Sequence, residues 1–290
     1  MRPAHYLSVV AAIALVAILY FGVNTVPPPK SPQKAEGEAS SHNTPQFPGP
    51  TFPPASFDSL NTAAHAALPA HGKEEISVNE KSLAGIKDSA TMSPLYDSLA
   101  SVWKEHKQLP MAAWATGEAA RLAHSEKKLT FAAQIFLDLA HREGQDPPVQ
   151  LWEAQQAAHL FDEAILINPA NDTLKLGLAA SYIEGTGETM KGVGILREIT
   201  AKEPDNIPAN LMLGGLSIQS GQWDKAIARY ETILKREPNN REALYFGGVA
   251  YKGKGDLSTA KALFEKVKKV VNDPAFSKEV DGLMNDTREK

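Results

Sequence analysis

The chain has 290 residues, of which 43% are hydrophobic, with a formal net charge of −4 and no cysteine. The missing cysteine excludes disulfides, thiolate metal sites and cysteine catalysis. The slightly acidic balance argues against a nucleic-acid-binding protein, which would usually be strongly basic. The hydrophobic content is enough for one sizeable folded region.

The N-terminus contains an uncharged stretch, residues 6–26, that is just long enough to cross a bilayer as a helix. We predict a transmembrane anchor over residues 1–26 and prefer it to a cleaved signal peptide, because no small-residue cleavage site follows the stretch. The expected location is the inner (cytoplasmic) membrane, single-pass, with the C-terminal domain in the bacterial periplasm. A domain that faces the cytosol on an organelle membrane is the alternative.

Residues 27–57 are predicted to form a proline-rich linker, because this composition does not bury a core. Residues 58–92 give a mixed signal, and we predict a partly ordered lead-in with two short helices. Within it, His65 and His71 are six residues apart across a proline, so a solvated pair is expected rather than a metal site. Folded structure is expected to resume at Ser93, with Ser93 as a helix cap and Pro94 in the first turn.

Residues 93–290 read as five pairs of amphipathic helices, followed by a short terminal helix over Phe276 to Met284. The clearest pairs are 171–203, 204–237 and 238–273, and the first of these three contains one extra residue, expected in the turn between Ile183 and Gly187. Five positions of the last two pairs recur with an offset of 34 residues: Pro204 and Pro238, Gly214 and Gly248, Gly221 and Gly255, Ala226 and Ala260, Tyr230 and Phe264.

The recurring residues resemble the tetratricopeptide repeat, whose pattern is W-x2-L-G-x2-Y…A-x3-F…P. The first copy has Leu213-Gly214, then Ala226-x3-Tyr230, and the second has Gly248-x2-Tyr251, then Ala260-x3-Phe264. The resemblance implies an all-α fold, a right-handed superhelix of about five stacked helix pairs plus a C-terminal capping helix. The paired glycines at 214–215 and 247–248 predict a close approach of two helices, with Ala226 and Ala260 on the opposing helix.

The sequence contains no motif that carries chemistry. Residues 187–192 imitate the start of a phosphate-binding loop, but Val193-Gly194 stands where Lys-Ser/Thr is required. Four histidines lie on different predicted helices and are expected to be exposed or hydrogen-bonded at helix ends: His106, His124, His141 and His159. We therefore predict that the protein is not an enzyme and that it holds no cofactor or metal.

In the resembled family, the first helix of each pair lines a concave groove that binds a peptide or a partner helix. The matching residues here are mostly apolar: Leu176, Ala180 and Ile183, then Leu211, Gly215 and Ile218, then Tyr245, Val249 and Lys252. The Lys and Asn clamp of the chaperone-binding members is absent, because Leu211, Met212, Tyr245 and Phe246 occupy the matching places. Packing between neighbouring repeats is the alternative role for each of these residues.

The sequence therefore predicts a membrane-anchored scaffold that binds an apolar segment of a protein partner, attached to the membrane through residues 6–26. A homo-oligomer contact through the same groove is left open. The alternative function is an accessory or assembly subunit of an envelope enzyme or cytochrome-maturation complex, with catalysis on a neighbouring chain.

Overall fold

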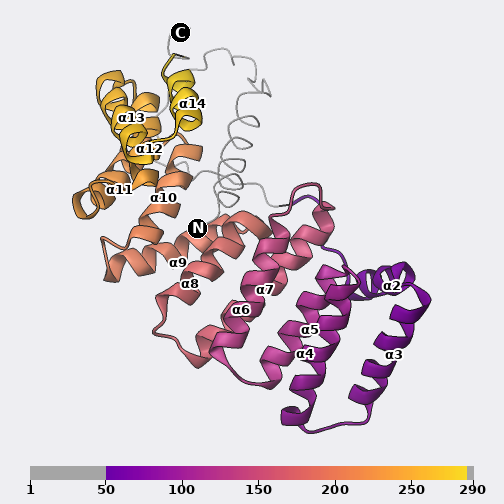
Figure 1. Ribbon diagram of the computed structural model, residues 1–290. Helices are drawn as coiled ribbons and strands as arrows, with labels where there is room; N and C mark the ends of the chain where they lie inside the picture. The colour runs from indigo at the N-terminus through magenta and orange to yellow at the C-terminus, as the bar shows by residue number, and fades with distance from the viewer. Residues whose placement is uncertain (1–49, 286–290) are drawn as a thin grey trace, which may run out of the picture. The chain divides into compact units, whose positions relative to one another are not determined.

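The computed structural model describes residues 50–285, which form thirteen α-helices and one short π-helix, with no strand within that range. Two helices come first, α2 (Phe57–Ala67) and α3 (Ala70–Ala84). Five pairs follow: α4 (Ser89–Glu105) with α5 (Leu109–Leu122), α6 (Glu126–Ala140) with α7 (Pro147–Ile167), α8 (Asp172–Ala180) with α9 (Thr189–Lys202), α10 (Ile207–Gln219) with α11 (Trp223–Arg236), and α12 (Arg241–Lys254) with α13 (Leu257–Val271). The terminal helix α14 (Pro274–Asn285) ends the described chain (Figure 1). The predicted all-α solenoid of stacked helix pairs is confirmed.

The 34-residue period is visible in the caps of α10 and α12. The side-chain oxygen of Asn206 accepts from the Ala209 N–H at 3.0 Å, and that of Asn240 accepts from the Ala243 N–H at 2.9 Å. Both asparagines satisfy backbone donors that a helix start leaves unpaired. Each amide also donates to the glutamate three residues earlier, which fixes the turn that enters the pair.

A glycine with positive φ ends the first helix of each of the last three pairs: Gly187 (72°), Gly221 (67°) and Gly255 (93°). These glycines are spaced by 34 residues, whereas Leu178 and Leu213 are 35 apart. The extra residue therefore lies before Gly187, and the structure absorbs it as a π-helix, η1 (Ser181–Thr186), that continues α8. The insertion was expected in the turn. It lies instead in the helix, because the turn glycine keeps its place in the repeat.

The glycines of α10 and α12 make room for aromatic rings. A Cβ added at Gly214 would lie 2.7 Å from Cζ of Tyr230, and one added at Gly248 would lie 2.7 Å from Cε1 of Phe264. The expected close approach of the helices that carry Ala226 and Ala260 is present, but these alanines are not the residues that face the glycines. The glycines face the ring four residues beyond each alanine, and both rings are almost fully buried.

The first helix pair begins earlier than the sequence predicted. Asp88 caps α4 by accepting the Thr91 N–H at 2.9 Å, so Ser93 and Pro94 lie inside the helix. Ser93 is buried, and its hydroxyl donates to the Ala119 carbonyl of α5 at 2.9 Å. Ser93 therefore does not cap α4. Its side chain points toward α5 and links the two helices.

The predicted linker is described only from residue 50 onward, and that part lies against the helices. The Ala55 N–H donates to the Pro148 carbonyl at 2.8 Å, at the start of α7. The Phe57 ring then packs on Trp114 of α5, with centroids 4.7 Å apart. Residues 50–56 are thus an extended segment docked on the solenoid, which leads into α2 (Figure 1).

The predicted membrane location requires a correction. Among the described residues, no helix combines the length and the apolar character needed to cross a bilayer. The longest of them, α7, has 21 residues but contains Glu153, Asp162 and Glu163 and packs along α6. Residues 6–26, on which the predicted location rested, lie outside the described residues.

Candidate protein-binding surface

The nine predicted groove residues lie on α8, η1, α10 and α12, the first helices of the last three pairs. Eight of them are partly exposed: Leu176, Ala180, Ile183, Leu211, Gly215, Ile218, Val249 and Lys252. Tyr245 is buried, with 9% of its surface exposed. The three successive helices thus present one strip of half-buried, mostly apolar residues.

Five members of this strip also pack between repeats. Ala180 packs against the buried cluster of α5 to α8. Leu176 and Ile183 pack against the buried cluster formed by α8, α9 and α10, while Leu211 and Ile218 pack against the cluster of α11 and α12. These side chains are held in place by the core on one side. Their remaining exposed surface is therefore a rigid, preformed contact area.

The last repeat is covered by the chain's own terminal helix. Tyr245 packs on Phe276 of α14, with ring centroids 6.0 Å apart, and Lys252 Nζ donates to the Leu283 carbonyl at 2.7 Å. Burial, with a smaller contribution from Glu279, raises the pKa of Tyr245 to about 12. Tyr245 and Lys252 therefore hold the capping helix, which leaves the strip more open on α8 and α10.

The middle one of the three predicted positions in each repeat is Ala180, Gly215 or Val249, and the first two of these are small. A Cβ added at Gly215 would meet no atom within 4 Å, so the surface above this glycine is open. Small residues at this place leave space above the helices, where a bound segment can approach the backbone closely.

The π-helix borders a cavity of about 250 Å³. Its lining is mixed and more polar than apolar: Phe52 from the extended segment, Leu151 from α7 and Ile183 from η1 are its large apolar side chains, and Gln150 and Glu184 are among its polar ones. The η1 backbone lies close to α7, since a Cβ at Gly185 would stand 2.2 Å from Cβ of Ala154. Of the nine predicted residues, only Ile183 lines this cavity.

An ion pair stands at the polar edge of the cavity. His141 Nε2, at the end of α6, lies 3.1 Å from Glu184 Oε2 of η1. The hydrogen bond that His141 donates to the Glu184 carboxylate raises the pKa of His141 above its ordinary value, against the opposing effect of burial. The pair joins the second helix pair to the third and gives the cavity a polar rim.

The sequence reasoning did not find this cavity. The one signal in the sequence was the 35-residue spacing. It shows that a residue is inserted but not that the insertion forms a π-helix. Such helices often accompany functional sites. The docked segment at residues 50–55 had no signal beyond its proline content.

The tetratricopeptide repeat family model matches residues 191–245 and 217–278. This C-terminal part of the chain therefore carries tetratricopeptide repeats, as the 34-residue recurrence predicted. No curated protein matches the chain in sequence.

Solved structures with similar helix arrangements include the MamA protein, with 17% identity, a TM-score of 0.47 and coverage of 63% of this chain and 93% of that one. YrrB, described as a tetratricopeptide-repeat protein with an unusual peptide-binding site, has 16% identity, a TM-score of 0.44 and coverage of 65% and 91%. A tetratricopeptide repeat protein from Parabacteroides merdae has 15% identity, a TM-score of 0.49 and coverage of 78% and 84%.

Proposed function

We propose that this protein is a scaffold that binds another protein through the strip on α8, α10 and α12. In this proposal one large side chain of the partner enters the cavity beside η1, where it meets both apolar and polar lining groups. The cavity is the observation that carries the proposal. Its volume of about 250 Å³ is below the range of roughly 300–1,000 Å³ typical of small-molecule sites, and it suits one large side chain of a polypeptide.

The docked N-terminal segment supports an extended partner. Pro50 and Phe52 already line the cavity, and three residues later the Ala55 N–H bonds to Pro148. The start of α7 therefore accepts an extended backbone together with its side chains. A partner segment with an aromatic or large aliphatic residue would use the same kinds of contact: apolar burial in the cavity and a few backbone hydrogen bonds.

The nature of the strip supports a binding function over a catalytic one. Two of its three middle positions are small, its flanking positions are apolar, and Lys252, its one charged member, is engaged by α14. A surface of this kind provides area and shape, which are the requirements for binding an apolar segment. It lacks the cluster of titratable groups that general acid–base chemistry needs.

The proposal is tested by site-specific photo-crosslinking of the full chain in its native cells. A photoreactive residue replaces Glu184 at the cavity rim, Gly215 on α10, or Met190 on α9. Met190 is the matched control, because it is similarly exposed and close in sequence but does not line the cavity. We expect the same partner protein to be captured from positions 184 and 215 and not from position 190.

A second comparison uses substitutions. Glu184→Lys reverses the charge at the cavity rim and Met190→Lys adds a charge away from it, and both side chains are exposed. Because Glu184→Lys also removes the ion pair with His141, thermal unfolding of both variants establishes that the fold is intact. Loss of partner recovery with Glu184→Lys alone supports the proposal. Equal capture from all three crosslinking positions, or unchanged recovery with Glu184→Lys, would overturn it.

A further inference from the structure

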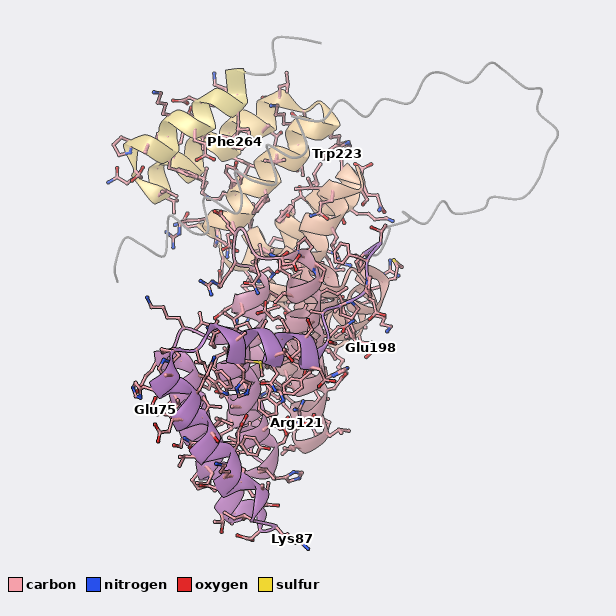
Figure 2. The ribbon with its side chains drawn as sticks, turned by 90° about the vertical axis from the view of Figure 1, so that its right-hand side faces the viewer. Glu75, Lys87, Arg121, Glu198, Trp223 and Phe264 are labelled. Carbon is pink, nitrogen blue, oxygen red and sulfur yellow. The ribbon has the colours of Figure 1, made fainter. Side chains whose placement is uncertain are left out.

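A cluster of three metal-ligating side chains lies far from the groove, where α3 meets the end of α4. His71 and Glu75 are one turn apart on α3, and His106 is the residue that ends α4. His71 Nδ1 lies 3.6 Å from Glu75 Oε1, and His106 Nε2 lies 3.0 Å from Glu75 Oε2. Glu75 can be located on α3 in Figure 2. Among the described residues, this is the one group of three such side chains whose ligand atoms all lie within 4.8 Å of one another.

The backbone of α3 is adapted to this cluster at Gly72. A Cβ at that position would lie 2.8 Å from both Cε1 and Nε2 of His106. The imidazole of His106 therefore rests directly on the helix, between His71 and Glu75, and only glycine leaves room for it. The ring is largely buried, with 14% of the side chain exposed, so its Nε2 is held toward the carboxylate.

The spacing of the three groups fits a tetrahedral metal ion. Zinc binds imidazole nitrogen and carboxylate oxygen at about 2.0–2.2 Å, so two ligand atoms at a tetrahedral angle stand roughly 3.3–3.5 Å apart. The two imidazoles approach different oxygens of Glu75, His106 at 3.0 Å and His71 at 3.6 Å, and one ligand atom from each of the three residues lies within 4.8 Å of the others. Side-chain rotation can therefore bring the three atoms to this spacing. A third separation, between the two imidazoles, closes by rotation of His71, whose side chain is 73% exposed.

We propose that His71, Glu75 and His106 form a binding site for one Zn²⁺ ion, with water as the fourth ligand. Two imidazoles and one carboxylate are a donor set that zinc accepts in proteins. The exposed side of His71 gives the ion its entry path and leaves a position for the water. The site joins the lead-in helix α3 to the first helix pair, so bound zinc stabilises the N-terminal end of the solenoid.

Two other histidine–carboxylate pairs lack the third group. His141 with Glu184 and His65 with Glu80 each place one imidazole within 3.3 Å of one carboxylate, but neither pair belongs to a three-residue group among the described residues. An ordinary ion pair needs two groups. The third ligand and the glycine that seats it are what distinguish the α3–α4 cluster.

The test is a zinc titration of the purified full chain after treatment with a chelator, read by isothermal calorimetry and by thermal unfolding. We expect one equivalent of Zn²⁺ to bind and to raise the unfolding temperature. His71→Ala, Glu75→Gln and His106→Ala should each weaken binding by at least about tenfold to a hundredfold, as disruption of a zinc coordination sphere does. His71→Ala is the decisive variant for a correctly folded chain, because this side chain is mostly exposed.

The matched control is His141→Ala, which removes a histidine from a two-group pair and should leave zinc affinity unchanged. Circular dichroism of each zinc-free variant establishes that the helices are intact. The proposal is overturned if the wild-type chain does not saturate at one equivalent, or if folded His71→Ala binds zinc as tightly as the wild type.

Discussion

The N-terminal and C-terminal helix pairs share one arrangement but are held together by different contacts. In α10 to α13, each first helix has a glycine that receives an aromatic ring from the second helix. In α4 to α7, alanines make up much of the buried surface, and Ala113, Ala115 and Ala119 of α5 are almost fully buried. The family model matches only from residue 191 onward. Stacked helix pairs therefore need only apolar stripes and suitable turns. The repeat motif corresponds to one particular packing, in which an aromatic ring lies against a glycine.

The two regions also differ in how they bury polar groups. Asn210 of α10 is fully buried, and its amide donates to two backbone carbonyls while its oxygen accepts from Arg229 at 2.9 Å. Glu153 of α7 is equally buried, but only Oε2 has a partner, the Gln145 amide at 2.6 Å. Its Oε1 has none among the described residues. The buried amide of α10 is therefore fully satisfied, whereas the buried carboxyl group of α7 is not.

The largest effect that follows is a pH-dependent gain in stability from Glu153→Gln. Desolvation raises the pKa of Glu153 from its ordinary value of 4.5 to about 7. Because the folded state favours the protonated form, the carboxyl group stabilises the fold fully below pH 4.5, and this contribution is lost as the pH rises through 7. Glutamine keeps a neutral acceptor for Gln145. At pH 8 the variant should therefore be more stable than the wild type by about 2–3 kcal/mol, from the size of the pKa shift.

The measurement is urea unfolding of both proteins between pH 4.5 and pH 8. The difference between the two curves isolates the one group, and it should shrink toward zero at the acidic end. Glu143→Gln is the control, since Glu143 is an exposed carboxylate in the loop that precedes α7. If the stability difference at pH 8 equals that at pH 4.5, ionisation of the buried Glu153 carboxyl group does not destabilise the fold.

The adjacent glycines Gly214 and Gly215 of α10 test whether an aromatic ring requires a glycine opposite it. Gly214→Ala places a methyl group 2.7 Å from the buried ring of Tyr230, and overpacking of this kind costs about 1–3 kcal/mol. Gly215→Ala meets no neighbouring atom, and it should stabilise α10 by about 0.5–1 kcal/mol through helix propensity. Opposite signs in thermal or urea unfolding are expected. If both alanines stabilise the chain, the glycine at 214 is not required by the ring.

Much of this fold could be predicted from sequence because the 34-residue recurrence fixes both helices and turns. The recurring prolines and glycines located the junctions, and the apolar spacing located the buried faces. The start of α4 was missed because Ser93 fits a cap by residue type, and only the tertiary contact with Ala119 shows its role. The π-helix was missed because an inserted residue has the same effect on spacing in a turn as in a helix.

The candidate site could be predicted only in part. The helices that present the groove residues follow from the repeat, and the nine positions do lie on those helices. Their individual exposure does not follow, since Tyr245 is covered by α14 and Lys252 is bound to it. Residues distant in sequence that the fold brings together, such as Phe52 and Ile183 in the lining of one cavity or His71 against His106, have no periodic signal.

The smallest effect concerns one hydroxyl group in the repeated aromatic position. Tyr230 and Phe264 occupy equivalent places, but the buried Tyr230 hydroxyl has no hydrogen-bond partner among the described residues, and burial raises the pKa of that tyrosine. A buried polar group without a partner is destabilising, so Tyr230→Phe should stabilise the chain by up to about 1 kcal/mol. The reciprocal change, Phe264→Tyr, adds a hydroxyl beside Gly248 and should cost about 1–3 kcal/mol. Urea unfolding of the two variants measures both signs. A loss of stability in Tyr230→Phe would mean that the hydroxyl has a hydrogen-bond partner in solution. The tyrosine would then stabilise its repeat in a way that Phe264 does not.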